Sequence, residues 1–276
     1  MNTNLPSIAV IGAGAMGGAI LSGLLKPGVT VEGGIRVTNR TEAKAAVVRA
    51  PGVESFAIES TPDANARAVA GAAIVLLGVK PAMIPDALAE LAAALEPDAL
   101  IISVAAGVTT ATMESIVTNP VLRAMPNTPA IIGRAVTGLA AGSRATASQV
   151  ALGRTLFETV GTVIELPEAQ IDALGTISGS GPAYVFYFIE ELTRTAVGLG
   201  FTPEQAAEMV NGTFLGATEL LVSSGKSPED LRRQVTSPNG TTMRAVAELE
   251  SADLKSLFDR ATAAALARTR ELAAGN

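Results

Sequence analysis

The segment IAVIGAGAMGGAILSGLL, residues 8–25, contains the pattern that decides the fold. It begins with a short β-branched apolar run, continues through glycines, and ends in an apolar stretch typical of a buried helix. The glycines have the spacing GxGxxG at residues 12–17. Alone, this spacing is a weak signal. Between a strand and a helix at the start of an α/β pattern, it is typical of a dinucleotide-binding fold.

Glycine is expected at each of the three motif positions for a different physical reason. Gly12 permits the tight turn, Gly14 lets backbone N–H groups approach a pyrophosphate, and Gly17 lets the helix pack closely on the strand. The N-terminus of the helix also favours negative charge. The alternative is a glycine-rich turn that only connects two elements. We expect the following residues to bind the cofactor: Gly12, Ala13, Gly14, Ala15, Met16 and Gly17.

Further apolar runs alternate with helical segments as far as residue 166. Strands are expected at residues 8–11, 35–38, 74–79, 100–104, 121–125, 136–140 and 162–166. This alternation predicts an α/β fold with a parallel, doubly wound sheet of the Rossmann type. No strand pattern follows, whereas Thr202-Pro203 and Ser227-Pro228 are strong helix starts. We therefore expect a Rossmann domain over residues 1–166 and an all-helical second domain over residues 167–276.

Composition removes several classes of chemistry from consideration. The 276 residues include no histidine and no cysteine, which excludes disulfides, thiolate nucleophiles, Cys/His zinc sites and Ser-His-Asp relays. No acidic cluster has metal-ligand spacing, so we expect no metal. The net charge is −6 without a basic cluster, which argues against nucleic acid and membrane surfaces as partners. Without a signal peptide or an apolar membrane span, we expect a soluble cytoplasmic protein.

The residues after the second expected strand bear on the choice of cofactor. An NAD site usually has Asp or Glu there to bind the ribose 2′-hydroxyl. Here the sequence is Thr38-Asn39-Arg40-Thr41. Arg40 can pair with a 2′-phosphate, and Asn39 and Thr41 can donate hydrogen bonds. We therefore favour NADPH, with NADH possible; the alternative is a surface arginine beside a helix cap.

Two further strands end in segments suited to a cofactor, since ligands of open α/β sheets lie at the carboxyl ends of strands. The segments are residues 78–81 and 103–107. The residues expected to line the cofactor are Gly78, Val79, Lys80, Pro81, Ala105 and Ala106. Lys80 has two interpretations: a catalytic acid, or a lysine whose stem packs while its ammonium reaches solvent.

The polar run TSPNGTT at residues 236–242 precedes a helical pattern. Consecutive N–H groups at the start of a helix, with hydroxyls beside them, form a cradle for an anion. The residues alone leave two interpretations open. One is a loop that binds a carboxylate, and the other is an elaborate helix cap.

Six segments, in order along the chain, together resemble the Δ1-pyrroline-5-carboxylate reductases, the last enzymes of proline synthesis. They are GAGAMGGAI, GVKP, SVAAGVT, RAMPNTPA, SGSGPAYVF and LRRQVTSPNGTTMRAVAELE. The resemblance covers nearly the whole chain, and its last segment is the most specific. It implies NAD(P)H-dependent reduction of 1-pyrroline-5-carboxylate to L-proline, with the helical domain serving in dimerisation and substrate binding. It also implies a homodimer with interwoven C-terminal helices, often assembled into a decamer of five dimers.

The resemblance also implies roles for single residues. Asn65 is expected to contact the cofactor ribose, and Thr242 to act as the catalytic residue by hydrogen bonding to the ring nitrogen. The substrate carboxylate is expected to bind Ser237, Asn239, Gly240, Thr241 and Thr242. One departure is visible, because the family usually has glycine where this chain has Asn239. Asparagine tolerates positive φ better than other non-glycine residues.

Imine reduction is compatible with a chain that lacks histidine. The cofactor supplies the hydride, a cyclic imine is basic enough to arrive as an iminium, and no oxyanion forms. One alternative is a β-hydroxyacid dehydrogenase, but such enzymes generally use a lysine on a second-domain helix. Lys226 and Lys255 are the only lysines beyond residue 166, and neither lies near residues 178–184. The other alternative is a non-catalytic NADPH-binding sensor, which would not need a carboxylate-binding loop.

Overall fold

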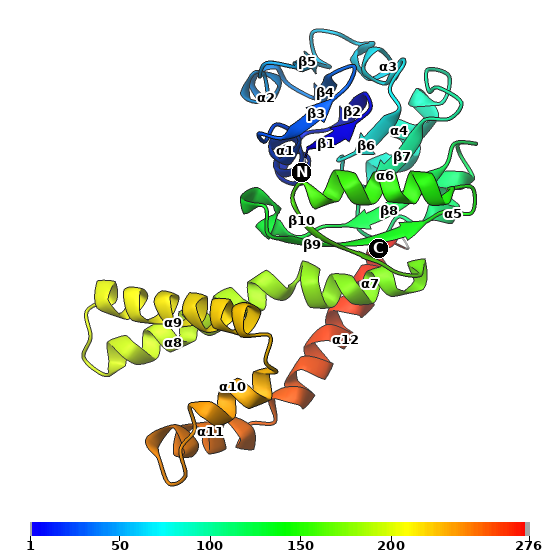
Figure 1. Cartoon of the computed structure of the whole chain (residues 1–276). Coiled ribbons are helices and arrows are strands. Elements are labelled where there is room, and N and C mark those ends of the chain that lie inside the picture. Colours follow the sequence, from blue (N-terminus) through cyan, green and yellow to red (C-terminus); the bar gives the residue numbers. More distant parts are fainter. Residues whose placement is uncertain (1, 274–276) are drawn as a thin grey trace. The chain divides into compact units, whose positions relative to one another are not determined.

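The computed structural model describes residues 2–273, which form two compact units (Figure 1). Of the described residues, the first unit comprises 2–180 together with 265–273, and the second comprises Gly181–Ala264. The last strand of the sheet ends at Glu165, close to the boundary expected at residue 166. That boundary separates sheet from helices rather than the two compact units, and as a domain boundary it stays a prediction.

A single large sheet organises the first unit. Its strand order is β10-β9-β8-β7-β6-β2-β4-β5 among the described residues. The strands are β2 (Ile8–Ile11), β4 (Ile35–Asn39), β5 (Val53–Ala57), β6 (Ile74–Leu77), β7 (Leu100–Ser103), β8 (Val121–Met125), β9 (Ala135–Ala141) and β10 (Gly161–Glu165). Every expected strand is present, with ends shifted by no more than two residues. The predicted Rossmann-type sheet is therefore confirmed.

One pair of strands departs from the expected parallel arrangement. Strands β8 and β9 are antiparallel, whereas every other pair in the sheet is parallel. The connection between them, residues 126–134, contains only the short 3₁₀ helix η2 (Thr128–Ile132). A parallel crossover needs about a dozen or more residues, so this connection returns the chain in the opposite direction.

Helices cover both faces of the sheet (Figure 1). Successive strand residues point to opposite faces, and the buried core divides accordingly. On one face, Val10 and Leu76 pack with residues of α1 (Ala15–Leu24) and α6 (Ala147–Glu158). On the other face, Ala9 and Val75 pack with residues of α3 (Ala64–Val69), α4 (Ile84–Leu91) and α5 (Thr110–Glu114). The sheet is doubly wound, as the alternating pattern predicted.

Several short elements escaped the sequence analysis. Strand β5 is an edge strand whose residues alternate incompletely, and its burial is only partial. Strands β1 (Thr3–Leu5) and β3 (Val29–Val31) form a separate two-stranded parallel sheet. Helix α2 (Glu42–Val47) begins after Thr41, where the sequence allowed a helix cap. The other short helices of the unit are η1 (Pro81–Met83), η3 (Glu168–Gln170), α7 (Ile171–Leu174) and a π-helical turn over Gly175–Gly179. Runs this short give too few residues for a periodic pattern.

The second unit is helical, as predicted, and residues 166–273 contain no strand. Its helices are α8 (Gly181–Gly198), α9 (Pro203–Ser224), α10 (Pro228–Gln234), α11 (Thr241–Ser251) and the first part of α12 (Leu254–Ala273). Thr202 and Gln205 form the expected capping box at α9, and the Ser227 hydroxyl accepts the first hydrogen bond of α10. No helix in residues 2–273 is both long and apolar enough to cross a membrane.

The helical unit exposes many large apolar side chains. Helices α8 and α9 pack as a pair, yet few of their apolar residues are fully buried. The exposed set includes Val185, Phe186, Tyr187, Leu192, Val197, Leu215, Leu220 and Val222. Isolated exposed apolar residues are ordinary, but a set spread over two neighbouring helices is typical of a surface that another protein chain covers.

Candidate functional site

Three glycines pack against one another where β2 and β6 end. Gly12 has φ +86°, a conformation that favours glycine. A Cβ added to Gly17 would lie 2.7 Å from the Gly12 carbonyl oxygen, and one added to Gly78 would lie 2.3 Å from the same oxygen. A Cβ on Gly12 itself would lie 2.9 Å from Val79 Cγ1. The first and last glycines of the motif are therefore required by the packing of the protein itself.

Gly14 is different, because the fold leaves open space beside it. It is the N-cap residue of α1, and a Cβ added there would meet no heavy atom within 4 Å. Ala15 and Met16 begin the helix, and its first turn carries no acidic side chain. Ala13 connects Gly12 to this open helix start. The helix start is suited to a pyrophosphate that approaches the backbone closely. The turn fits the cofactor that the sequence predicts.

The end of β4 places unpaired polar groups where the adenosine of a dinucleotide is expected. Asn39 is 4% exposed, and its Nδ2 has no hydrogen-bond partner among the described residues. A buried donor without a partner costs about 1–3 kcal/mol, so this amide is suited to a ligand. The exposed Arg40 guanidinium likewise forms no hydrogen bond or ion pair within residues 2–273. Thr41 caps α2 by accepting a hydrogen bond from the Lys44 N–H.

An acidic residue that the sequence analysis missed lies beside this loop. Glu59 follows β5, and its N–H donates to the Arg40 carbonyl oxygen at 3.2 Å. Its carboxylate accepts the Glu42 N–H at the start of α2 at 2.6 Å. No pattern in the sequence pointed to Glu59, because β5, the strand that places it there, was not predicted. The end of β4 itself carries no acid, but the neighbouring β5 brings this carboxylate beside it.

Asn65 is held with one amide atom free. It lies in α3 and is 8% exposed, and its Nδ2 donates to Glu90 Oε1 of α4 at 3.2 Å. Its Oδ1 is buried without a partner among the described residues. Because a carboxylate can only accept, Glu90 fixes the orientation of the amide. The free Oδ1 is then an acceptor suited to a ribose hydroxyl.

The other expected cofactor residues lie at the carboxyl ends of β6 and β7. These strands neighbour each other, and β6 also neighbours β2, so all three end at the same edge as the glycine turn. Pro81 begins η1, and the side chain of Lys80 is exposed without a partner in the described chain. Ala105 is buried and Ala106 is exposed. The structure thus gathers the sequence-predicted cofactor residues at one edge of the sheet.

The polar loop of the helical unit is a tight turn followed directly by α11. The Gly240 N–H donates to the Ser237 carbonyl oxygen at 3.0 Å, and Asn239 has φ +61°. Proline in the second position and positive φ in the third are typical of a type II turn. A Cβ on Gly240 would lie 2.5 Å from Ser237 Oγ. The asparagine that departs from the family pattern therefore occupies the left-handed conformation that usually requires glycine.

The hydroxyls of this loop do not cap the helix. The N-cap residue of α11 is Gly240, and no side chain caps the helix N–H groups. Ser237, Thr241 and Thr242 form no side-chain hydrogen bond within residues 2–273, and all three are exposed. The helix-cap interpretation thus loses its support. What remains is a set of free hydroxyls and helix N–H groups suited to an anion.

Comparisons with known proteins are consistent with both units. A family described as pyrroline-5-carboxylate reductase dimerisation matches residues 168–272, and one described as NADP oxidoreductase, coenzyme F420-dependent, matches residues 7–107. The chain is 40% identical over 271 residues to a pyrroline-5-carboxylate reductase of Pseudomonas aeruginosa, covering 97% of each chain.

Solved structures are similar along the whole chain as well. A pyrroline-5-carboxylate reductase from Coxiella burnetii has a TM-score of 0.88 at 37% identity, with 96% of this chain and 97% of that chain covered. A pyrroline carboxylate reductase from Plasmodium falciparum with NADP bound has a TM-score of 0.83 at 23% identity, with 99% and 100% covered. The second likeness concerns the fold alone.

Proposed function

The chain belongs to the pyrroline-5-carboxylate reductase family, and we propose on that premise that it reduces 1-pyrroline-5-carboxylate to L-proline. The reaction is hydride transfer from NADPH to the C=N bond, the last step of proline synthesis. The observation that carries the proposal is the 40% identity over 97% of the chain to a relative of that name. The free polar groups of the two units support it independently.

The first unit offers a separate set of contacts to each part of NADPH. The open helix start at Gly14 would receive the pyrophosphate, Asn39 and Arg40 would bind the 2′-phosphate, and Asn65 would bind a ribose; the open space at Gly14 and the unpartnered amide atoms of Asn39 and Asn65 support these roles. Val79, Lys80 and Pro81 would lie along the nicotinamide half, and we assign Gly78, Ala105 and Ala106 to the same part of the cofactor because they follow the neighbouring strand ends of β6 and β7. When bound, NADPH supplies the hydride. The protein supplies position, because near-attack geometry alone contributes several kcal/mol to a transfer step.

The second unit offers contacts to the substrate. The N–H groups at the start of α11 and the hydroxyls of Ser237 and Thr241 are suited to the carboxylate. The Thr242 hydroxyl accepts a hydrogen bond from the N–H of the iminium and so orients it, or relays one proton to the ring nitrogen, and it does not itself ionise. A chain with no histidine is sufficient, because the imine nitrogen is already basic and its reduction creates an amine rather than an oxyanion.

We propose a homodimer built on the helical unit. The family description that matches residues 168–272 refers to dimerisation, and the exposed apolar residues of α8 and α9 need a partner surface. Assembly of five such dimers into a decamer rests on the family resemblance, and a cytoplasmic location stays a prediction. Light scattering coupled to size exclusion distinguishes dimer from decamer, and a monomer at micromolar concentration would contradict both.

The activity is tested by following NADPH oxidation with 1-pyrroline-5-carboxylate. Parallel reactions use NADH with the imine, and NADP with 3-hydroxyisobutyrate and related hydroxy acids in the reverse direction. We expect rapid turnover of the imine with NADPH and none of the hydroxy acids. Turnover of hydroxy acids alone would identify a β-hydroxyacid dehydrogenase. NADPH binding without any turnover would identify a sensor.

A further inference from the structure

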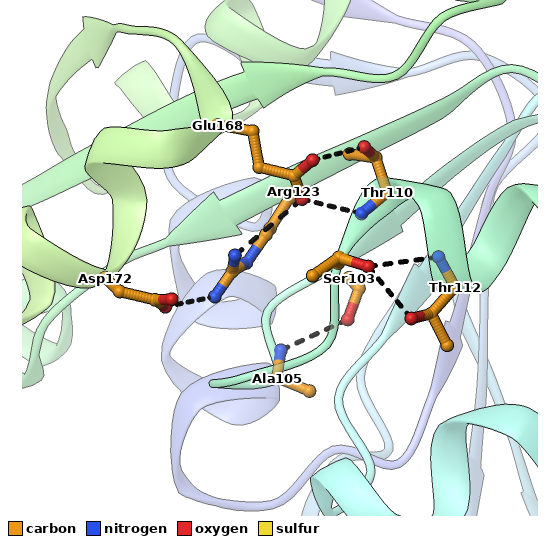
Figure 2. Close-up of polar contacts among 8 residues, drawn as sticks. Ser103, Ala105, Thr110, Thr112, Arg123, Glu168 and Asp172 are labelled. Atoms are coloured by element: carbon orange, nitrogen blue, oxygen red, sulfur yellow. Dashed lines mark hydrogen bonds and ion pairs between the residues drawn. The ribbon is translucent and has the colours of Figure 1, made fainter. Parts of the chain in front are cut away.

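A buried arginine in β8 lies beside the carboxyl end of β7, where it pairs with Ser103 (Figure 2). Arg123, in β8, is 1% exposed. Its Nη2 donates to Asp172 Oδ1 at 2.5 Å, and its Nη1 lies 3.7 Å from Glu168 Oε1. Its Nε is buried without a partner among the described residues. Buried ion pairs often contribute little to the free energy of unfolding, and an unsatisfied buried donor lowers it. Stability alone therefore does not explain this arrangement.

Glu168 uses the same carboxylate to hold the start of α5. Its Oε1 accepts the Thr110 N–H at 2.6 Å, and its Oε2 accepts the Thr110 hydroxyl at 2.5 Å. Figure 2 shows the carboxylate between the guanidinium of Arg123 and the backbone of Thr110. Thr110 is 6% exposed, and the Glu168 side chain is 26% exposed. Charge-assisted hydrogen bonds of this kind are the stronger ones in proteins.

Thr110 directly follows the loop after β7, and the other end of that loop is also fixed. The loop comprises residues 104–109. At its beginning, the Ala105 N–H donates to the hydroxyl of the fully buried Ser103 at 3.2 Å. Gly107, in the middle, has φ +75°. The loop is therefore held at both ends around a turn that favours glycine, and it carries Ala105 and Ala106.

We infer that Glu168, anchored by Arg123, is a positioning residue for hydride transfer. It holds loop 104–109 in the position that sets the nicotinamide of NADPH against the substrate. This inference rests on the proposed function, which assigns Ala105 and Ala106 to the nicotinamide half. Glu168 does not touch the reacting atoms; it acts through Thr110 and the loop.

A positioning role has a kinetic signature that a purely structural role lacks. A displacement of about 1 Å at the reacting carbons can lower the rate of transfer by about 10²-fold. Most of the proposed contacts to NADPH lie elsewhere, at the glycine turn and the adenosine end. Loss of the Glu168–Thr110 contact should therefore lower kcat much more than it raises KM for NADPH. It should also enlarge the isotope effect from NADPH deuterated at the transferred position.

The experiment compares Thr110→Val, which removes the hydroxyl but keeps the shape, with Thr110→Ser, which restores the hydroxyl. Glu168→Ala removes both acceptors. Its matched control is Glu165→Ala, which deletes a carboxylate paired with Arg154 at 2.6 Å and does not contact the loop. Circular dichroism and thermal unfolding of each full-length variant establish the folded fraction. Kinetics then use NADPH and deuterated NADPH with 1-pyrroline-5-carboxylate.

We expect Thr110→Val and Glu168→Ala to lower kcat by about tenfold to hundredfold and to raise the isotope effect. KM for NADPH should change by less than about threefold, and Thr110→Ser and Glu165→Ala should resemble the wild type. Normal kcat in folded Thr110→Val and Glu168→Ala overturns the inference alone. So does a loss of kcat that only follows the folded fraction, with an unchanged isotope effect. A wild-type protein that does not reduce the imine overturns the proposed function as well.

Discussion

Replacement of Gly14 by alanine separates cofactor binding from folding. The added methyl group meets no heavy atom within 4 Å in the protein, and φ −72° with ψ −158° at Gly14 is accessible to alanine. Alanine restricts the unfolded chain, which stabilises the fold by about 0.4–1 kcal/mol. As an N-cap it is poorer than glycine, which costs an amount of about the same size. We expect the free energy of unfolding to stay within about 1 kcal/mol of wild type.

The same methyl group should strongly weaken NADPH binding. It occupies the open space through which the pyrophosphate would approach the N–H groups at the start of α1. Hydrogen bonds to a charged group contribute about 1.5–3 kcal/mol each. Loss of one therefore raises Kd by about tenfold to 150-fold, since each 1.4 kcal/mol is a factor of ten.

Gly17→Ala is the matched control, because its Cβ would lie 2.7 Å from the backbone oxygen of Gly12. Backbone cannot yield as a flexible side chain does, so we expect a loss of about 1–3 kcal/mol in the free energy of unfolding. Denaturant unfolding measures stability, and titration calorimetry with NADPH measures Kd. If Gly14→Ala binds NADPH like wild type, or loses as much stability as Gly17→Ala, the division of roles between these glycines is refuted.

Substitutions at four further positions test the remaining contacts. Arg40→Ala should raise KM for NADPH at least about tenfold and leave KM for NADH within about twofold, because only NADPH has the 2′-phosphate; equal losses in steady-state kinetics would contradict this role. Glu59→Gln should lower KM for NADPH by about two- to threefold and leave KM for NADH unchanged, since it removes an exposed, screened negative charge beside Arg40; the same assay would exclude the effect if both constants moved together. Thr242→Ala should lower kcat by about 10²-fold with Kd for NADPH unchanged, and Thr242→Ser should recover most of the rate; wild-type turnover in the alanine variant would remove Thr242 from the site. Asn239→Gly should preserve thermal stability while Asn239→Ala costs about 1 kcal/mol, because φ is +61° there; equal melting temperatures would show that the turn relaxes.

The fold was predictable from the sequence where a constraint is local. The glycine motif between an apolar strand and a helix specifies its own geometry, and the buried strands of a parallel sheet are continuous apolar runs. Strand β5 was not predictable in the same way. It is an edge strand with the sequence VESFA and only partial burial, so neither alternation nor apolarity identifies it. The antiparallel pairing of β8 and β9 depends on the length and shape of their connection, which an apolar pattern does not report.

The candidate site was predictable to the extent that its residues belong to motifs. Arg123 lies within an apolar strand, but its partners Glu168 and Asp172 come from a segment far along the chain. No spacing rule links such residues, because the sheet topology brings them together. The loop at residues 237–242 shows a different limit. Its composition suits a cap and an anion site equally, and only the observation that Gly240 caps α11 without side-chain help separates the two.

Both units carry unpaired amides and hydroxyls, and this has a chemical consequence. Asn39 Nδ2 and Asn65 Oδ1 are buried without partners among the described residues, and the free hydroxyls of Ser237 and Thr242 are their counterparts in the helical unit. Groups of this kind do not ionise near neutral pH, so they orient ligands without carrying a titration of their own. The pH dependence of turnover should then belong to the imine, whose protonated form accepts hydride more readily. A fold that only positions its two ligands can dispense with histidine because the substrate brings its own proton.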